Sequence, residues 1–282
     1  MVLAAVGQIC STAYMKPNLE QCARLVAQAS AGGAKVLFLP EASDYIATSA
    51  EESLTSAQPP SASSFVLGLR EAAKAYSVAI HVGIHEPVPT PPTQPIQKLF
   101  NTAIYITQTG DILDSASYSK LHVFDYASLK ESTTVEPGSK LTPPFDSPVG
   151  RIGSLICFDL RFAEPAIALA QPGENSAWYK TPAQILTYPS AFTLRTGQAH
   201  WEVLLRARAV ETQSWVVASA QVGKHNDKRM SYGQSLVVDP WGEVRVRLGG
   251  VKDGGQEEIG FVDLDMGLLE KVRREMPLLR RT

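Results

Sequence analysis

Cysteine is scarce in this sequence, and neither sign of charge dominates it. Its 282 residues include three cysteines, Cys10, Cys22 and Cys157, with no CxxC spacing. An odd number of isolated cysteines argues against a disulfide framework and against a cysteine-rich zinc site. The 26 lysines and arginines nearly balance the 28 aspartates and glutamates, which gives a net charge of −2. Because nucleic acids and anionic membrane surfaces select basic proteins, we predict neither as a partner.

Long apolar runs are also missing. Runs such as residues 36–39 fall far short of the roughly 18 apolar residues that a membrane helix needs. The N-terminus has no basic segment followed by an apolar stretch, as a signal peptide would have. Since hydrophobic residues still make up 44% of the chain, we expect a cytoplasmic globular protein with a sizeable core.

Motifs that mark several common enzyme classes are absent. The sequence contains no GxGxxG, GxxxxGK[ST], HExxH or GxSxG, so the nucleotide-binding, zinc-protease and serine-hydrolase signatures all fail. His81 and His85 have the spacing of a helical metal site, but they lie on a predicted strand, where it separates two side chains by about 13 Å. We therefore predict no metal and no cofactor.

Strand-like and helix-like segments alternate along the chain, which predicts an α/β fold. The predicted strands are residues 2–8, 36–39, 79–84, 154–157, 185–188, 215–220, 235–238, 244–247 and 259–262, with a hairpin of 103–107 and 112–118. The predicted helices are residues 18–31, 61–76 and 198–212, and another helix begins near Ala163. Residues 86–98, which are rich in proline, and residues 171–183 are predicted surface loops. No linker divides the chain, so we predict a single domain, residues 1–282.

Three residues with reactive side chains follow predicted strands. Glu41 follows strand 36–39, Lys120 follows strand 112–118, and Cys157 ends strand 154–157. Each has an ordinary alternative: a surface acid, a surface lysine and a buried thiol. Together they form a consistent set, because a cysteine nucleophile needs a base and acyl transfer needs a cation near the developing oxyanion. Strand ends that share one edge of a sheet bring such groups together.

The motifs around these residues resemble the nitrilase (carbon–nitrogen hydrolase) superfamily. They are FLPEASDY, YSKLHVFD, GSLICFDLRFAEP, YPSAFTLRTGQAHWEVLLRARAVETQSWVV and SYGQSLVVDPWGEV, in that order. The text FTLRTGQAHWEVLLRARAVETQ is similar to the Nit branch, particularly its deaminated-glutathione amidases. The resemblance implies a four-layer α-β-β-α sandwich of two six-stranded sheets. It also implies a homodimer or a higher homo-oligomer that forms through a helix-bearing face.

Roles for individual residues follow from the same resemblance. It implies that Glu41 is the general base, Cys157 the nucleophile and Lys120 a donor to the tetrahedral intermediate. Glu131, in LKEST, matches a second glutamate that orients ammonia or water. The backbone N–H of Phe158 would be the second donor to the oxyanion. The substrate would be a small anionic amide, and the candidates to bind it are Tyr45, Arg161, Arg195 and Thr196, although Arg161 also suits a structural salt bridge.

The resemblance leaves the substrate and two loops open. It favours deaminated glutathione, and an ω-amidase acting on α-ketoglutaramate or α-ketosuccinamate is the alternative. A catalytically silent interaction module is disfavoured by the intact Glu, Lys and Cys set, and a papain-like protease by the lack of a suitably placed histidine. Residues 171–183 look inserted, and residues 86–98 look longer than usual, so either loop could alter access to the pocket. Ala163 stands where members commonly have proline.

Overall fold

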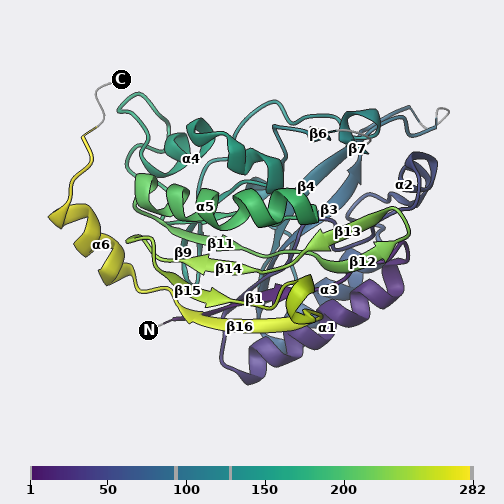
Figure 1. Cartoon of the computed structure of the whole chain (residues 1–282), viewed down its shortest axis with the longest axis horizontal. Coiled ribbons are helices and arrows are strands. Elements are labelled where there is room, and N and C mark those ends of the chain that lie inside the picture. The colour runs from purple at the N-terminus through teal and green to yellow at the C-terminus, as the bar shows by residue number, and fades with distance from the viewer. Residues whose placement is uncertain (1, 92–94, 127–128, 280–282) are drawn as a thin grey trace.

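Two six-stranded sheets form the centre of the molecule in the computed structural model (Figure 1). The structure describes residues 2–91, 95–126 and 129–279. The first sheet has the order β16-β1-β2-β3-β4-β5. Its strands are β1 (Leu3–Gln8), β2 (Val36–Phe38), β3 (Ala79–Pro87), β4 (Leu99–Ile106), β5 (Tyr118–Ser119) and β16 (Glu258–Asp263).

The second sheet repeats the pairing pattern of the first. It has the order β15-β14-β11-β10-β9-β8. Its strands are β8 (Phe145–Ser147), β9 (Gly150–Ser154), β10 (Ile185–Thr187), β11 (Trp215–Ala218), β14 (Leu236–Val238) and β15 (Val244–Arg247). In each sheet three consecutive strands are parallel, β1-β2-β3 and β9-β10-β11, and antiparallel strands flank them on both sides.

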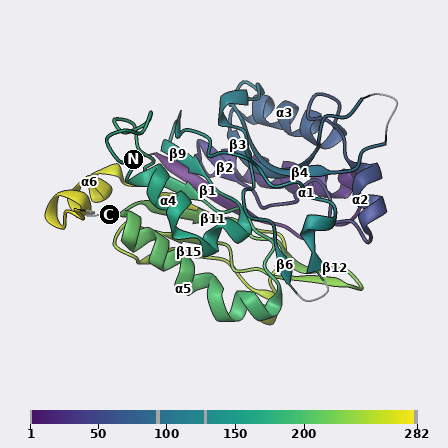
Figure 2. The same cartoon turned by 90° about the horizontal axis from the view of Figure 1, so that it is seen from above.

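Alternating side chains along each strand create the layers. On β2, Val36 and Phe38 pack between the two sheets, whereas Leu37 packs against helices α1 (Met15–Ala31) and α3 (Ser64–Tyr76). The second sheet is covered on its outer face by α4 (Ala163–Ala170) and α5 (Leu194–Thr212). Figure 2 shows α3 and α5 on opposite sides of the strands. Strands that are apolar on both faces therefore produce the predicted α-β-β-α sandwich, which is confirmed.

Smaller elements complete the described chain. Helix α2 (Ala50–Ser56) lies near the end of the sandwich that carries the ribbon of β12 (Val222–Asn226) and β13 (Arg229–Tyr232), and α6 (Met266–Glu275) lies at the opposite end (Figure 1). A second ribbon pairs β6 (Asp125–Tyr126) with β7 (Leu129–Lys130). A 3-10 helix, Glu131–Thr133, follows it directly.

Most elements lie where the sequence pattern predicts them, and two predicted strands are wrong. The predicted strand 154–157 overlaps β9 only at Ser154, because the chain leaves the ladder there and enters the 3-10 helix Cys157–Arg161. Gly150 and Gly153, which favour a turn in the sequence pattern, lie within β9 instead. Residues 112–118 make a single bridge, Ile106 to Ile112, and then form the 3-10 turn Asp114–Ala116 before the short strand β5. Aspartate and serine favour turns over a ladder, which explains the interruption. Helices α2 and α6 and the β12–β13 ribbon were not predicted, because α2 buries no residue and α6 buries only Leu269 and Val272.

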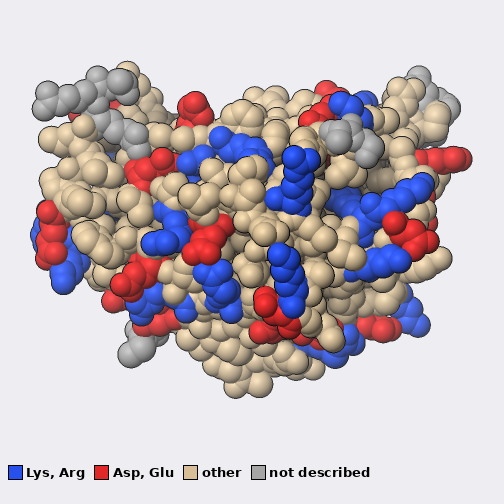
Figure 3. Space-filling model, viewed as in Figure 1, with Lys and Arg blue, Asp and Glu red and all other residues tan. Residues whose placement is uncertain are grey.

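The two predicted loops are partly described. Residues 86–98 connect β3 to β4 as a hairpin excursion, since Pro87 pairs with Leu99, and residues 92–94 lie outside the described part. Residues 171–183 join α4 to β10, and Trp178 Nε1 donates to the carbonyl of Ala168 at 2.7 Å. None of the described helices is both long and apolar enough to span a bilayer. Basic and acidic side chains are interspersed on the face shown in Figure 3.

Candidate active site

Glu41 lies just beyond the carboxyl end of β2, in a tight passage beside β3. Its side chain is buried, and the residue is 4% exposed. A Cβ on Gly83 would lie 2.6 Å from the Cα of Glu41, so only glycine allows β3 to pass this closely. Ala42 has a φ of 52°, a left-handed conformation that turns the chain away from the strand. The backbone therefore directs the carboxylate of Glu41 inward, between the ends of the sheets.

Lys120 follows β5 and reaches the same place from the edge of the first sheet. Its backbone N–H donates to the carbonyl of Asn101 at 2.9 Å, which continues the pairing of β5 with β4. The Nζ atom donates to Glu41 Oε1 at 3.0 Å and to both carboxylate oxygens of Glu131 at 2.9 Å. Because Lys120 is 2% exposed, these two acids provide the pairing that a buried ammonium requires.

Glu131 and Asn101 hold this cluster together. Glu131 begins the 3-10 helix after β7, and its Oε2 accepts the backbone N–H of Phe124 at 2.6 Å. The Nδ2 of Asn101, on β4, donates to Glu41 Oε1 at 2.6 Å and to Glu131 Oε1 at 3.1 Å. Sequence reasoning missed Asn101, although an asparagine in the apolar strand LFNTAI was a usable signal.

Cys157 stands at a sharp turn after β9. Its φ of 45° is left-handed, which is strained for a residue with a side chain, and its N–H donates to the carbonyl of Pro189 at 3.0 Å. This turn brings the thiol into the cavity that Glu41 and Ala191 also line, close enough to Glu41 for the two groups to shift each other's pKa. The nucleophile is therefore held by backbone geometry beside the acid that would take its proton.

A buried carboxylate connects the cysteine turn to the segment that carries Lys120. Asp159, which is fully buried, accepts the backbone N–H of Ile156 at 3.0 Å. It also accepts the hydroxyl of Tyr118 and Nδ1–H of His122, each at 2.7 Å. Tyr118 and His122 lie two residues before and two residues after Lys120, so Asp159 fixes Lys120 and Cys157 relative to one another.

Burial and charge together set the protonation states of the site. Burial would raise the pKa of Glu41, but the Lys120 ammonium and hydrogen bonds from Cys157, Lys120 and Asn101 bring it below its ordinary value of 4.5. Burial would lower the pKa of Lys120, yet the carboxylates of Glu131 and Glu41 raise it above its ordinary value. Burial and the neighbouring Glu41 raise the pKa of Cys157, and Lys120 opposes them only in part. The resting site thus holds a neutral thiol beside a carboxylate and an ammonium.

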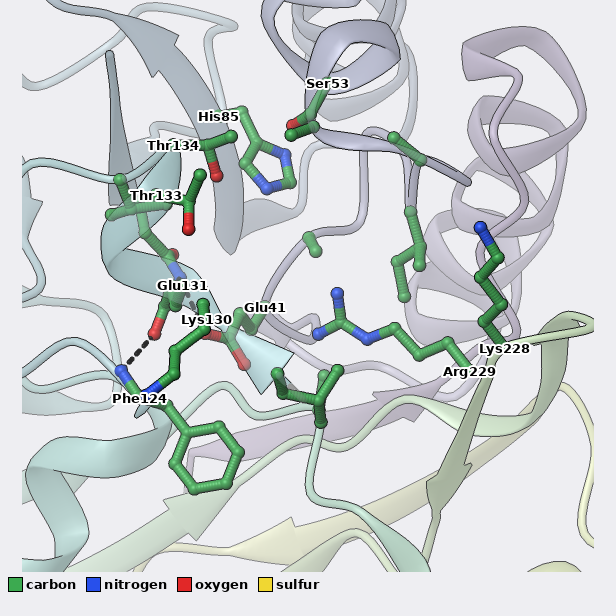
Figure 4. A pocket seen from close by; sticks show the side chains of 18 of the residues that line it. Glu41, Ser53, His85, Phe124, Lys130, Glu131, Thr133, Thr134, Lys228 and Arg229 are labelled. Atoms are coloured by element: carbon green, nitrogen blue, oxygen red, sulfur yellow. Dashed lines mark hydrogen bonds between the residues drawn. The ribbon is translucent and has the colours of Figure 1, made fainter. Parts of the chain in front are cut away.

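A cavity of about 400 Å³ opens over these groups. Glu41, Lys120, Glu131 and Cys157 all line it. Figure 4 shows its walls: Phe124 and Lys130 on one side, His85 and Ser53 at the far end, and Lys228 and Arg229 on the other side. This volume lies within the range of about 300–1,000 Å³ that small-molecule sites occupy.

Comparison with known proteins agrees with this geometry. Residues 3–274 match the family model described as carbon–nitrogen hydrolase. This chain belongs to the carbon–nitrogen hydrolase family.

The relatives of this carbon–nitrogen hydrolase lie in the Nit branch of the nitrilase superfamily, as the sequence motifs predicted. A "probable hydrolase nit2" of Schizosaccharomyces pombe is 44% identical and is matched over 100% of this chain and 98% of its own length. The "deaminated glutathione amidase" of Bos taurus is 39% identical, over 99% of this chain and 81% of its own. The crystal structure of the Caenorhabditis elegans NitFhit protein superposes with a TM-score of 0.83 at 35% identity, over 98% of this chain and 63% of that one.

The structure separates the site residues of this carbon–nitrogen hydrolase into two groups. The four residues predicted to be catalytic converge on the cavity, whereas Tyr45, Phe158, Arg161, Arg195 and Thr196 are not among the residues that line it. Fully buried Tyr45 donates its hydroxyl to the carbonyl of Ser53 at 2.8 Å. The ring of Phe158 packs on Phe124, with centroids 5.1 Å apart. The backbone N–H of Phe158 belongs to the peptide bond that joins it to Cys157.

The other three predicted binding residues have local roles around α5. Arg161 contacts His200 Nδ1 at 3.0 Å and lies 5.6 Å from the centre of the Phe158 ring. Arg195 is exposed on α5, and the Oγ1 of Thr196 lies 2.9 Å from the Oγ1 of Thr193, the residue that caps this helix. The sequence motifs suggested that these residues bind substrate, but their side chains contact other residues and do not line the cavity.

The polar residues that do face the cavity were missed. Lys130, Lys228, Arg229, Asn226, Thr133, Thr134 and His85 all line it. His85 is held by Asp44, which lies 2.9 Å from its Nδ1 and accepts its backbone N–H at 2.8 Å, and it stacks on Tyr45. Most of the others lie on ribbons and turns, where sequence periodicity carries no signal. Over the described residues, no cluster of three or more His, Cys, Asp or Glu side chains could hold a metal.

Proposed function

We propose that this protein is a cysteine-dependent amidase that hydrolyses the amide of a small α-keto acid, with deaminated glutathione as the favoured substrate. The observation that carries the proposal is that Cys157, Glu41 and Lys120 line one cavity, in which Lys120 donates a hydrogen bond to the carboxylate of Glu41. The name of the Bos taurus relative, deaminated glutathione amidase, supports the choice of substrate.

The first half-reaction forms a thioester. The sulfur of Cys157 attacks the amide carbonyl carbon while its proton passes to Glu41, because the raised pKa keeps the thiol neutral until the C–S bond forms. The Lys120 ammonium and the backbone N–H of Phe158 stabilise the oxyanion. Collapse of the tetrahedral intermediate breaks the C–N bond, and Glu41 returns the proton to the departing nitrogen. The amine leaves, and the acyl group stays on the sulfur.

The second half-reaction consumes a water molecule. Glu41, again a carboxylate, takes a proton from the water as its oxygen attacks the thioester carbonyl. Lys120 remains cationic throughout, because its pKa is raised, and stabilises the second oxyanion. The C–S bond then breaks, and the sulfur recovers the proton from Glu41. Glu131 acts through its two contacts with Lys120, which orient the ammonium.

Hydrolysis of deaminated glutathione tests this proposal directly. We expect the wild type to release α-ketoglutarate and cysteinylglycine, and Cys157→Ala to lose on the order of 10⁴-fold or more in kcat. Cys22→Ala is the matched control, because Cys22 is a buried thiol in α1 that is remote from the cavity lining. Equal turnover by wild type and Cys157→Ala would refute the mechanism. The ratio of kcat/KM for deaminated glutathione and α-ketoglutaramate decides between the main substrate and the ω-amidase alternative.

The setting of the enzyme is part of the same proposal. We propose that residues 1–282 form one catalytic domain of a cytoplasmic homodimer or larger homo-oligomer, without nucleic acid or membrane as partner. The net charge of −2 supports the last point. Light scattering on the purified chain would measure the assembly, and a monomer at micromolar concentration would refute that part.

A further inference from the structure

Cationic side chains stand on two different walls of the cavity. Lys228 and Arg229, on the β12–β13 ribbon, form what we call the ribbon arm, and Lys130, on β7, forms the opposite arm. In Figure 4 Arg229 extends toward Glu41 from one side, and Lys130 lies on the other side, next to Phe124. Glu41 lies between the two arms in this view.

These cations lack ion-pair partners within the described chain. No carboxylate oxygen of a described residue lies within 4.0 Å of Lys130, Lys228 or Arg229. The acid nearest in sequence to the ribbon arm, Asp227, is paired with Lys224 at 2.7 Å instead. Exposed lysines and arginines that line a cavity without partners remain available to bind an anion.

The groups beneath the arms carry more negative than positive charge. Lys120 lies there between two carboxylates, Glu41 and Glu131, and pairs with both. An anionic substrate terminus is therefore repelled from the reacting centre and attracted to the arms. A neutral amide between two anionic ends fits this pattern, since the amide would lie over Cys157 while each end meets a cation.

We propose that the two arms bind the two terminal carboxylates of one substrate, one on the acyl side and one on the amine side of the scissile amide. The inference rests on the proposed function and extends it. Deaminated glutathione has both carboxylates, one beside the keto group and one on its glycine, whereas α-ketoglutaramate has only the first. The arms would therefore select an amide whose leaving amine carries a carboxylate.

Binding to a non-reacting enzyme tests this selection. In the Cys157→Ala background, calorimetry measures Kd for deaminated glutathione, for its glycine carboxamide and for α-ketoglutaramate. Lys130→Gln removes the charge of the opposite arm, and the double variant Lys228→Gln/Arg229→Gln removes both charges of the ribbon arm. Lys224→Gln is the control, because Lys224 lies on the same ribbon but does not line the cavity.

Each arm variant should weaken binding of deaminated glutathione by roughly 10-fold, whereas the control should weaken it by no more than about twofold, through its charge alone. The carboxamide and α-ketoglutaramate should respond to one arm variant and not to the other, because they lack the amine-side carboxylate. Four results would overturn the inference. The carboxamide could bind equally less tightly to both arm variants, or deaminated glutathione could bind as tightly to each arm variant as to the parent. The control variant could weaken binding as much as the arm variants do, or none of the three ligands could bind.

Wild-type turnover separates this inference from the proposed function. Hydrolysis of deaminated glutathione without dependence on the arms would refute the inference and leave the function intact. Arm-dependent binding without hydrolysis by the wild type would refute the function and leave the two-carboxylate site intact. The arm variants made with Cys157 present should raise KM more than they lower kcat, because the arms contact the substrate ends and not the reacting atoms.

Discussion

The floor and the rim of the cavity are built on different physical principles. The floor, which we define as Glu41, Asn101, Lys120, Glu131 and Cys157, is made of buried groups that hydrogen-bond one another. The rim, defined as Lys130, Lys228 and Arg229, is made of exposed cations without ion-pair partners among the described residues. The same cavity thus combines a buried charge cluster, whose members depend on one another, with exposed cations that are available to bind an anion.

This difference explains how one fold can keep its chemistry and change its substrate. A buried ammonium is tolerated only while its acids remain, so a change at one floor position leaves the others uncompensated. A rim lysine can be replaced at little cost in stability, because water solvates the site it leaves. Substrate choice can therefore vary at the rim while the reaction at the floor is preserved.

The largest expected difference between floor and rim is the loss of stability when one lysine in each is replaced. Lys120→Met leaves two carboxylates facing each other without a buried cation, which should cost about 3–5 kcal/mol in the free energy of unfolding and remove activity. Lys228→Met should change stability by less than about 0.5 kcal/mol. Urea unfolding at pH 7 measures both. Similar losses in the two variants would show that the floor is not the tightly coupled unit described here.

Lowering the pH should reduce the contribution of Glu41 to the free energy of unfolding. Its folded pKa lies below 4.5, its ordinary value, so the carboxylate contributes stability that is fully present above about pH 4.5 and is lost as pH falls through the lower folded value. The difference in unfolding free energy between wild type and Glu41→Gln should therefore be constant from pH 7 to about 5. It should shrink as the pH is lowered further. A difference that grows on acidification would contradict the sign of the shift.

Asn101 should affect the rate of the reaction more than the binding of substrate. Its amide donates to Glu41 and Glu131 and so fixes the two acids around Lys120. Asn101→Ala should lower kcat by about 10- to 100-fold with little change in KM, because the acids lose their alignment while the rim is unaffected. Asn226→Ala, at the edge of the cavity, is the matched control. A rise in KM with unchanged kcat would instead make Asn101 a substrate contact.

Sequence reasoning reached the floor and missed the rim for a physical reason. Glu41 follows the apolar strand β2, and Cys157 follows the apolar pair Leu155 and Ile156 just after β9, so apolar runs in the sequence point to both residues. Lys228 and Arg229 reach the cavity from the β12–β13 ribbon at one end of the sandwich, where the sequence pattern predicted no strand (Figure 1). Arg161 is a candidate to bind an anionic substrate because it is a cation in a site motif, yet its guanidinium contacts His200.

The fold was predicted from apolar strand patterns too, and that prediction was wrong where a strand is short or polar. Most of the parallel strands at the centre of each sheet are apolar on both faces, so their positions could be recognised from composition. The exception is β9, whose sequence GRIGS is not apolar and which was predicted too far along the chain, at residues 154–157. The edge strand β5 has only two residues, and the segment before it forms a 3-10 turn that a period-two pattern cannot anticipate. Lys120 was placed correctly at the end of a strand, although that strand is shorter than predicted.

The smallest predicted effect concerns the negative charge of Asp227, which lies next to the rim in the sequence. Asp227 is highly exposed and pairs with Lys224 at 2.7 Å, beside the ribbon arm. Asp227→Asn should leave stability unchanged and lower KM for deaminated glutathione about twofold at low salt, because the ribbon gains one positive charge near an anionic ligand. The effect should disappear near 1 M NaCl, where the Debye length falls to about 3 Å. A twofold change that persists in high salt would mean that Asp227 acts through the conformation of the ribbon and not through its charge.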